Sequence, residues 1–229
     1  MLSQAGPLFF TFFSILLINL VLSGDNAVVI ALAVKTLPHR QRVRALMAGA
    51  GCAVVLRVTA TFFAGRLLNV EFLKLIGGVT ILWIAVKLFG EAAPSEAAAG
   101  AAPASFAKAI WFILLADITM SLDNILAIAQ IAEGSLLLLV IGLGISIPFV
   151  LFASGLLATL MDKYPLIVYL GAALLGKVGA EMMLTDRFTT QRLSPGPLVT
   201  YTIEAIAAAG VLIAGKLLAR RQVGELAVK

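Results

Sequence analysis

The sequence predicts an all-α membrane protein with seven transmembrane helices, built as a 3+3 inverted repeat plus a seventh helix. Of its 229 residues, 61% are hydrophobic and only 13% are charged, and the mean hydropathy is +1.06. Soluble domains carry about 25% charged residues, so this composition excludes a soluble domain. Two further observations give the layout: long apolar runs recur along the chain, and one short polar phrase occurs twice, 98 residues apart. We therefore expect a single transmembrane domain over residues 1–229.

Seven apolar runs are long enough to cross the hydrocarbon core of a bilayer, which takes about 20 residues. They cover residues 8–34, 45–65, 72–89, 106–132, 135–160, 164–184 and 197–219. The first run has no cationic segment before it, so we expect a retained helix rather than a signal peptide. The segment 90–105 is rich in Ala and contains Pro94 and Pro103, which predicts a flexible linker.

The linker separates two halves, residues 8–89 and 106–184, and the run 197–219 stands outside both. Three spans is an odd number, so the second half must cross the membrane in the opposite sense to the first. This predicts an inverted repeat, a layout in which transporters bind their substrate near the membrane midplane between the repeats.

Lys and Arg gather on one side of the predicted spans. They are Lys35, Arg40, Arg42 and Arg44 after the first run, and Lys216, Arg220, Arg221 and Lys229 near the end of the sequence. By the positive-inside rule, we expect the N-terminus outside and the C-terminus in the cytoplasm. These loops account for the net charge of +5, so we expect no nucleic-acid binding.

The duplicated phrase places polar side chains in the middle of two apolar runs. The first copy reads NLVLSGDN from Asn19 to Asn26, and the second reads DITMSLDN from Asp117 to Asn124. An ionised carboxylate at the bilayer centre costs roughly 2.5–3.5 kcal/mol, so its presence in two matching segments indicates a function. We interpret the phrase as a binding site for a cation.

A helical wheel separates the polar residues of each copy. The Asn or Asp at the start, the Ser and the final Asn share one face, at spacings i, i+4 and i+7, whereas Asp25 and Asp123 lie about 120° away. Either the helix unwinds near the Asp, so that carboxylate and backbone carbonyls converge on one ion, or each Asp points at the partner repeat. We favour the first arrangement, which Gly24 eases in the first copy.

The residue types indicate a hard cation. Carboxylate, amide and hydroxyl oxygens suit Mn²⁺, Mg²⁺ or Ca²⁺, and the predicted spans lack the Cys and His ligands that favour Zn²⁺ or Cu⁺. The predicted metal ligands are Asp25, Asn26, Asp117, Asp123 and Asn124. Accessory candidates are Asn19, Ser23, Ser121, Arg57, Lys177 and Glu204.

A structural alternative remains open for these residues. Asn and Ser side chains would then join helices, and each Asp would pair with a membrane Arg or Lys. The intramembrane charges would serve as counter-ions to the motif Asp residues or to one another, for example Arg57 to Glu204. We expect Lys87 and Glu181, near the ends of their spans, to reach toward the membrane surface.

The two phrases, SGDNAVVIA from Ser23 and SLDNILAIA from Ser121, resemble the TerC family of integral membrane proteins, in particular its YjbE-like branch. The resemblance covers nearly the whole chain. It implies a multi-pass protein of the bacterial inner membrane, within the lysine-exporter-like superfamily. The implied function is a secondary transporter that exports a divalent metal cation by alternating access, with Mn²⁺ as the ion.

Other functions stay open at this point. The carboxylates could bind the ammonium group of an exported basic amino acid, or the protein could be an accessory that supplies metal to exported proteins. A membrane-embedded hydrolase is the least favoured, because the predicted spans hold no nucleophile–base set with His or Cys. We expect no catalytic residues, no cofactor and, without a P-loop pattern, no direct use of ATP. The expected partners are the lipid bilayer and a divalent metal ion; a homodimer is left open.

Overall fold

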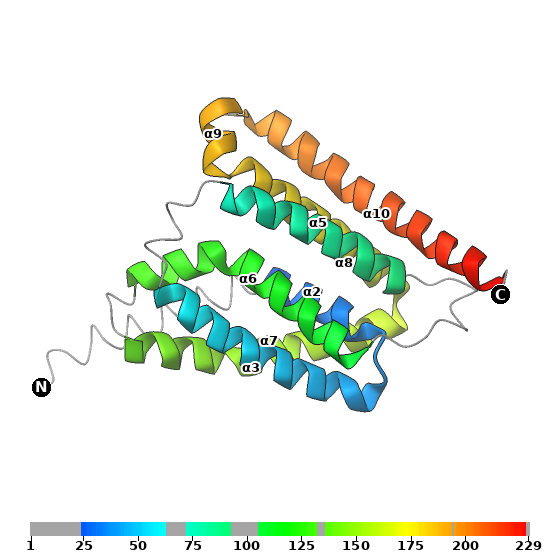
Figure 1. Cartoon of the computed structure of the whole chain (residues 1–229), viewed down its shortest axis with the longest axis horizontal. Coiled ribbons are helices and arrows are strands. Elements are labelled where there is room, and N and C mark those ends of the chain that lie inside the picture. Colours follow the sequence, from blue (N-terminus) through cyan, green and yellow to red (C-terminus); the bar gives the residue numbers. More distant parts are fainter. Residues whose placement is uncertain (1–23, 63–71, 93–104, 132–135, 194, 228–229) are drawn as a thin grey trace, which may run out of the picture.

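The computed structural model describes residues 24–62, 72–92, 105–131, 136–193 and 195–227, with the backbone alone for 61–62, 122–131, 136–147 and 221–227. Within these ranges every regular element is a helix, and none is a strand. The eight helices are α2 (Gly24–Lys35), α3 (His39–Phe62), α5 (Leu73–Ala92), α6 (Phe106–Ile131), α7 (Leu136–Lys163), α8 (Pro165–Leu184), α9 (Arg187–Leu193) and α10 (Pro197–Ala227), shown in Figure 1. The prediction of an all-α protein is confirmed.

The helix positions follow the predicted apolar runs closely. Each of the six runs after the first overlaps one long described helix, although α3 begins before its run and α10 ends after its run, and α2 covers the part of the first run that is described. Four helices are long and apolar enough to span a membrane within the described residues: His39–Ala60, Leu73–Ala92, Pro165–Leu184 and Pro197–Arg220. The count of seven spans and the inverted repeat stay predictions.

A short helix that the apolar runs did not predict, α9, joins α8 to α10. Its start is fixed by Asp186, which is buried and accepts a hydrogen bond from the backbone N–H of Phe188 at 2.9 Å. The same carboxylate accepts from the backbone N–H of Leu75 at 3.3 Å, in the first turn of α5. Asp186 thus caps two helix starts at once, which ties the α8–α9 corner to α5.

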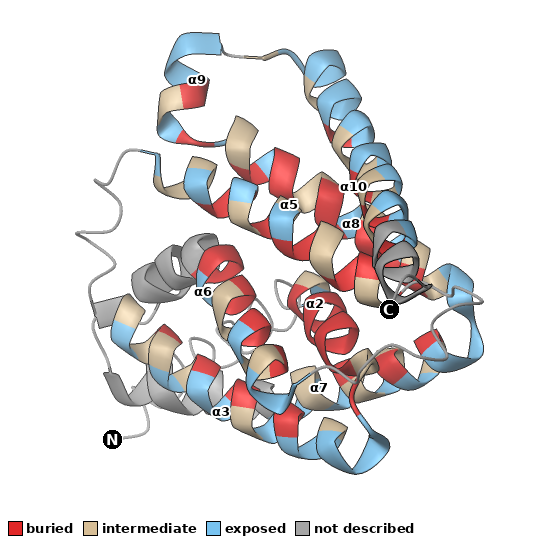
Figure 2. Ribbon diagram, turned by 45° about the vertical axis from the view of Figure 1, so that its right-hand side comes forward, coloured by how far each residue is buried: buried red, intermediate tan, exposed pale blue. Residues whose placement is uncertain are grey.

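The helix α2 lies at the centre of the bundle. All residues from Asn26 to Val34 are buried, so α2 is enclosed on every side, as a helix with no polar face requires. It packs against α6, α7 and α8, and more lightly against α3 and α5. Figure 2 shows this helix as a nearly continuous buried segment.

Two groups of helices enclose α2. Helices α5, α8 and α10 pack together on one side, and α3 packs with both α6 and α7 on the other. Helices at corresponding places in the two halves of the sequence also contact each other: α2 with α6, α3 with α7 and α5 with α8. The site described below is formed by α2, α3 and α6.

Glycines let the third helix of each half approach its counterpart. A Cβ atom added to Gly78 of α5 would lie 2.4 Å from the backbone oxygen of Gly179 of α8, and one added to Gly176 would lie 2.7 Å from the Cα atom of Ala208. Such close backbones are typical of helix contacts in membranes, where packing replaces the hydrophobic effect. Glycines therefore form small faces for helix packing on α5 and α8.

The outer faces of the bundle are apolar. Large apolar side chains are exposed on α3, α7 and α10, with Leu198 80%, Phe152 73% and Val55 68% exposed. A soluble protein rarely exposes so much contiguous apolar surface. These faces fit the lipid bilayer.

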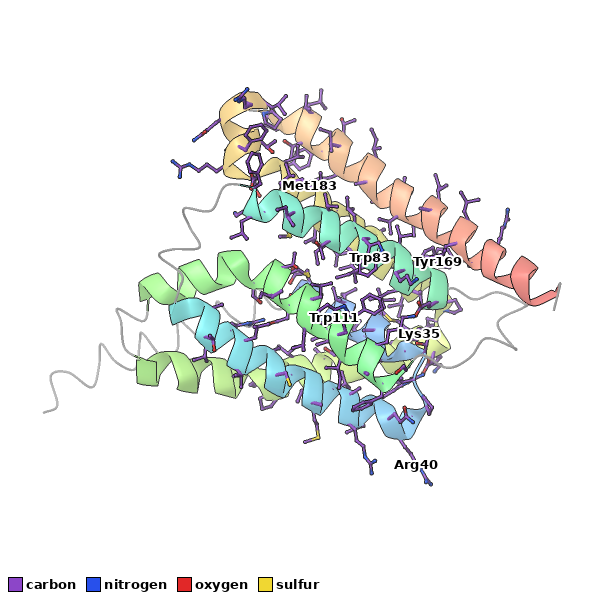
Figure 3. The ribbon with its side chains drawn as sticks, viewed as in Figure 1. Lys35, Arg40, Trp83, Trp111, Tyr169 and Met183 are labelled. Atoms are coloured by element: carbon purple, nitrogen blue, oxygen red, sulfur yellow. The ribbon has the colours of Figure 1, made fainter. Side chains whose placement is uncertain are left out.

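One end of the bundle carries the cationic loops. Lys35 ends α2, and Arg40 points away from the bundle at the same end (Figure 3). At this end, Lys216 of α10 also lies 5.1 Å above the ring of Tyr169. The one-sided distribution of these cations is therefore present in the fold, whereas the side of the membrane on which they lie stays a prediction.

Arg42 fixes the cationic end of α2. Its Nε atom donates to the carbonyl of Leu37 at 3.0 Å, its Nη2 atom donates to the carbonyl of Lys35 at 2.5 Å, and the guanidinium pairs with Asp162 of α7. Lys35 in turn donates to the carbonyl of Ala92, the last residue of α5, at 3.1 Å, and its burial lowers the pKa of its ammonium group. These bonds satisfy carbonyls that a helix end leaves free and hold α2 in place.

Candidate metal centre

The first copy of the duplicated phrase lies at the opposite end of α2 from Lys35. Asp25 is half-buried, and its Oδ1 atom accepts a hydrogen bond from the backbone N–H of Asn26 at 2.8 Å. Asn19 and Ser23 lie outside the described residues, as does any unwinding of the chain before Gly24. From Gly24 onward the chain is helical.

Asn26 is the first polar side chain of the site without a protein partner. It is 3% exposed, and neither its Oδ1 nor its Nδ2 atom makes a hydrogen bond within the described part of the chain. A buried polar group left unsatisfied costs about 1–3 kcal/mol, so such groups are rare without a reason. The amide oxygen of Asn26 is therefore available to a ligand.

Asp117, at the start of the second copy, is held by an arginine. The Nη2 atom of Arg57 on α3 donates to the Oδ1 atom of Asp117 on α6, and the two side chains are only 9% and 6% exposed. Arg57 is thus a counter-ion of a motif carboxylate, one of the roles that we expected for the intramembrane charges. The structure gives Glu204 a different partner, so the alternative pairing of Arg57 with Glu204 is wrong.

Half of the Asp117 carboxylate remains unused. Its Oδ2 atom is buried and makes no hydrogen bond within the described residues. Ser121, one turn further along α6, is fully buried and lies close to this carboxylate, but the geometry of its Oγ atom does not complete a hydrogen bond within the described residues. Two oxygen donors on α6 are therefore open, like the amide of Asn26 on α2.

The charged residues Asp25, Arg57 and Asp117 lie close enough for their charges to interact. The charge of Arg57 acts on the carboxylate of Asp25 as well as on that of Asp117. Asp25 on α2, Arg57 on α3 and Asp117 on α6 thus lie near one another, although they are far apart in the sequence. The charge of Glu181 on α8 also acts on Asp25.

Glu181 is a residue that our interpretation of the sequence missed. Its Oε2 atom lies 2.7 Å from the Nζ atom of Lys177, one turn earlier on α8. The expectation that Glu181 reaches toward the membrane surface stays a prediction. The spacing of four residues between a Lys and a Glu inside an apolar run was the signal that could have identified this pair. Lys177 and Glu204 are close as well, with Nζ and Oε2 3.8 Å apart.

The charges of Lys177, Glu181 and Glu204 form a second cluster that joins α8 to α10. Glu204 is nearly enclosed, with a side chain 7% exposed, whereas those of Lys177 and Glu181 are about half exposed at 45% and 49%. Because the charge of Glu181 influences the carboxylate of Asp25, this cluster extends the charged region from α2 toward the surface of the bundle.

The second Asp-Asn pair, Asp123 and Asn124, is described by its backbone only. The helix α6 is continuous from Phe106 to Ile131, so the unwinding that we favoured does not occur at Asp123. Leu122 occupies the place that Gly24 holds in the first copy, and leucine favours the helix where glycine weakens it. The side chain of Asp123 lies outside the described ones, so its binding of the same ion as Asp25 stays a prediction.

The described side chains alone do not complete a metal site. Among them, no group of three or more His, Cys, Asp or Glu side chains could hold a metal ion. They do supply hard oxygen donors from two helices, in Asp25, Asn26, Asp117 and Ser121. On the continuous helix α6, Asn124 occupies the same face as Asp117 and Ser121, at i+7 and i+3.

Comparisons with known proteins agree on one family. The chain matches the model of the family described as "Integral membrane protein TerC family" over residues 5–223, a range that includes both copies of the phrase. It is 40% identical over 170 residues to "Uncharacterized membrane protein YjbE" of Bacillus subtilis (strain 168), covering 74% of this chain and 77% of that protein.

Two further relatives are more distant. "Uncharacterized membrane protein YceF" of Bacillus subtilis (strain 168) is 28% identical over 177 residues, which cover 74% of this chain and 68% of that protein. "UPF0053 inner membrane protein YgdQ" of Escherichia coli (strain K12) is 26% identical over 184 residues, which cover 73% and 77%. No solved structure matches the chain. The chain therefore belongs to the TerC family of integral membrane proteins, as the resemblance of its duplicated phrase predicted.

Proposed function

We propose that the protein is a secondary transporter that exports a divalent metal cation, with Mn²⁺ as the ion, by alternating access across a bacterial inner membrane. The observation that carries this proposal is a set of buried side-chain atoms on α2 and α6 that make no hydrogen bond within the described part of the chain: the amide of Asn26, Oδ2 of Asp117 and Oγ of Ser121. They lie in the same charged region as the carboxylate of Asp25.

The chemistry of these atoms favours a hard cation. Oxygen ligands of carboxylates and amides suit Mn²⁺, Mg²⁺ and Ca²⁺, whereas the carboxylates of Asp25 and Asp117 would repel an anion. In the membrane interior, unpartnered carboxylate and amide oxygens are costly, and they persist where they bind or conduct a substrate. Asp123 and Asn124 of the second copy complete the proposed ligand set.

The packing of the helices supports transport rather than catalysis. The central helix α2 lies between two groups of helices, and each described helix of the first half contacts its counterpart in the second half. A rocking motion of one group against the other around a central site is the usual form of alternating access in inverted repeats. We propose no enzymatic activity, because the described buried side chains include no nucleophile–base set with His or Cys.

Relatives support the proposed membrane. The Escherichia coli relative is named an inner membrane protein, and we place this chain in the same type of membrane with its cationic loops in the cytoplasm. The exported ion would then leave toward the N-terminal side. Because the sequence has no P-loop pattern, we propose a proton or the membrane potential as the source of energy.

Flux measurements in proteoliposomes test the proposal. We expect the wild-type protein to carry Mn²⁺, and Asp25→Asn to abolish the flux, since this change removes a charge at nearly constant volume. The matched control is Glu91→Gln, which removes the exposed ion pair with Lys108 at the cationic end of the bundle, where the two side chains lie 2.6 Å apart. It should leave the flux unchanged.

The same vesicles separate metal from amino-acid transport. Lysine and arginine in large excess should not compete with Mn²⁺, and labelled lysine should not move. An absence of Mn²⁺ flux in the wild-type protein, or flux of lysine in its place, would contradict the proposal.

A further inference from the structure

Arg57 combines two features that together suggest a role in the transport cycle. It is a permanent cation in the interior of the bundle, 8% exposed, and it acts on carboxylates from both α2 and α6. A guanidinium does not lose its proton in proteins, so its charge is present whether or not a metal ion is bound. The empty site therefore already contains one positive charge.

The bond between Arg57 and Asp117 leaves room for a second cation. The Nη2 atom of Arg57 donates to Oδ1 of Asp117, while Oδ2 of the same carboxylate is buried and makes no hydrogen bond within the described residues. The strongest arginine–carboxylate pairs are bidentate and use both oxygens. This pair uses one, so the carboxylate has a buried oxygen to offer to a metal ion.

We propose that Arg57 is a tethered counter-cation that competes with the transported metal for Asp117, neutralises this carboxylate while the site holds no metal and makes release of the metal fast. This inference rests on the proposed function. Arg57 acts through Asp117 and is a positioning residue rather than a metal ligand, because a guanidinium and a metal cation repel each other.

The physical reason is the cost of the empty state. A transporter must return across the membrane without its ion, and buried carboxylates without a cation would resist this step. A guanidinium on the neighbouring helix α3 can neutralise Asp117 in the empty state and withdraw from it when the metal arrives. The same charge weakens metal binding and so prevents the ion from remaining bound.

The inference predicts opposite effects on binding and turnover. For purified full-length Arg57→Gln, the dissociation constant for Mn²⁺ should fall at least tenfold, and the maximal flux in proteoliposomes should also fall at least tenfold. A structural role alone would weaken or leave unchanged the binding of Mn²⁺. The matched control is Arg42→Gln on the same helix, whose ion pair with Asp162 lies at the cationic end, and it should leave the dissociation constant unchanged.

Arg57→Lys provides a second test that keeps the charge. The ammonium is a point charge without the planar fork of arginine, so it should hold Asp117 less firmly. We expect a dissociation constant at least threefold lower than that of the wild type, with a smaller loss of maximal flux than in Arg57→Gln. This variant decides the question if Arg57→Gln does not accumulate in the membrane.

The results separate the inference from the function on which it rests. If the wild-type protein binds Mn²⁺ and the folded variants bind it with equal or lower affinity, Arg57 is a structural partner of Asp117 and the inference is wrong. If the wild-type protein binds no Mn²⁺, the proposed function fails, and the inference fails with it.

Discussion

Removing Arg57 should destabilise the protein strongly in the absence of metal. In Arg57→Gln, the Asp117 carboxylate would have no partner for Oδ2 and would lose the bond to Oδ1, at a site where its side chain is only 6% exposed. Breaking a buried ion pair by removing one member costs about 3–5 kcal/mol. For a protein of this size each kcal/mol corresponds to about 2–4 °C, so the unfolding temperature should fall by about 10 °C.

A double variant isolates the pair from other effects. Arg57→Gln combined with Asp117→Asn leaves two neutral side chains of nearly the original size, so most of the lost stability should return. The control is Glu91→Gln, which breaks a partly exposed pair and should cost only about 0.2–1 kcal/mol. Thermal unfolding in detergent without divalent metal, followed by tryptophan fluorescence, compares the wild type with Arg57→Gln, Asp117→Asn, the double variant and Glu91→Gln.

The reasoning is refuted if Arg57→Gln unfolds at the wild-type temperature, or if the double variant is less stable than both single variants. Addition of Mn²⁺ gives an independent check. A ligand that binds only the folded state at 100 times its dissociation constant stabilises it by about 2.7 kcal/mol. Mn²⁺ should therefore recover much of the stability that Arg57→Gln loses. It should recover none of the stability that is lost by a variant without a metal site.

Three further predictions concern the helices around the site. Gly179→Leu should separate α5 from α8, because a Cβ atom at this position would lie 3.0 Å from the backbone oxygen of Gly78. The free energy of unfolding should fall by about 1–3 kcal/mol. An unchanged unfolding temperature would contradict the close packing. Lys177→Met should destabilise the protein more than Lys177→Arg, because only Lys177→Met removes the cation near the nearly enclosed carboxylate of Glu204. Equal unfolding temperatures would show that this pair does not stabilise the protein. Because the pKa of Lys35 is lowered in the folded state, the unfolded state binds more protons at a pH between this pKa and the ordinary lysine value of 10.5. The free energy of unfolding should therefore rise with pH in that range. Lys35→Met should remove the rise.

The sequence predicted the helices well because membrane spans follow from local composition. An apolar run of about 20 residues has few alternatives to a helix in a bilayer, since every backbone polar group must find a partner within the segment. The helices α5 and α8 accordingly lie close to the predicted runs 72–89 and 164–184. The helix α9 was missed because its seven residues are mostly polar, and its start depends on Asp186, a cap that also serves α5.

The partners of the charged residues were harder to predict. The sequence placed Asp117 and Arg57 among the candidates, but their pairing depends on how α3 packs against α6, and Glu204 was an equally good partner on composition alone. Glu181 was not among the candidate site residues for the same reason, since its influence on Asp25 appears only when α8 is packed beside α2. Residue types and spacing therefore identified the candidate ligands, whereas the counter-ions came from tertiary structure.

Direct binding of Mn²⁺ to the purified protein tests the central claim of a shared cation site most directly. Electron paramagnetic resonance gives the number of bound ions, since free and bound Mn²⁺ differ in their signals. We predict one ion per chain for the wild-type protein and for Glu91→Gln, and loss of that ion in both Asp25→Asn and Asp123→Asn. Two results would contradict a single site formed by both copies of the phrase. One is two bound ions per chain, of which each Asp variant loses one. The other is binding at the wild-type level in either variant.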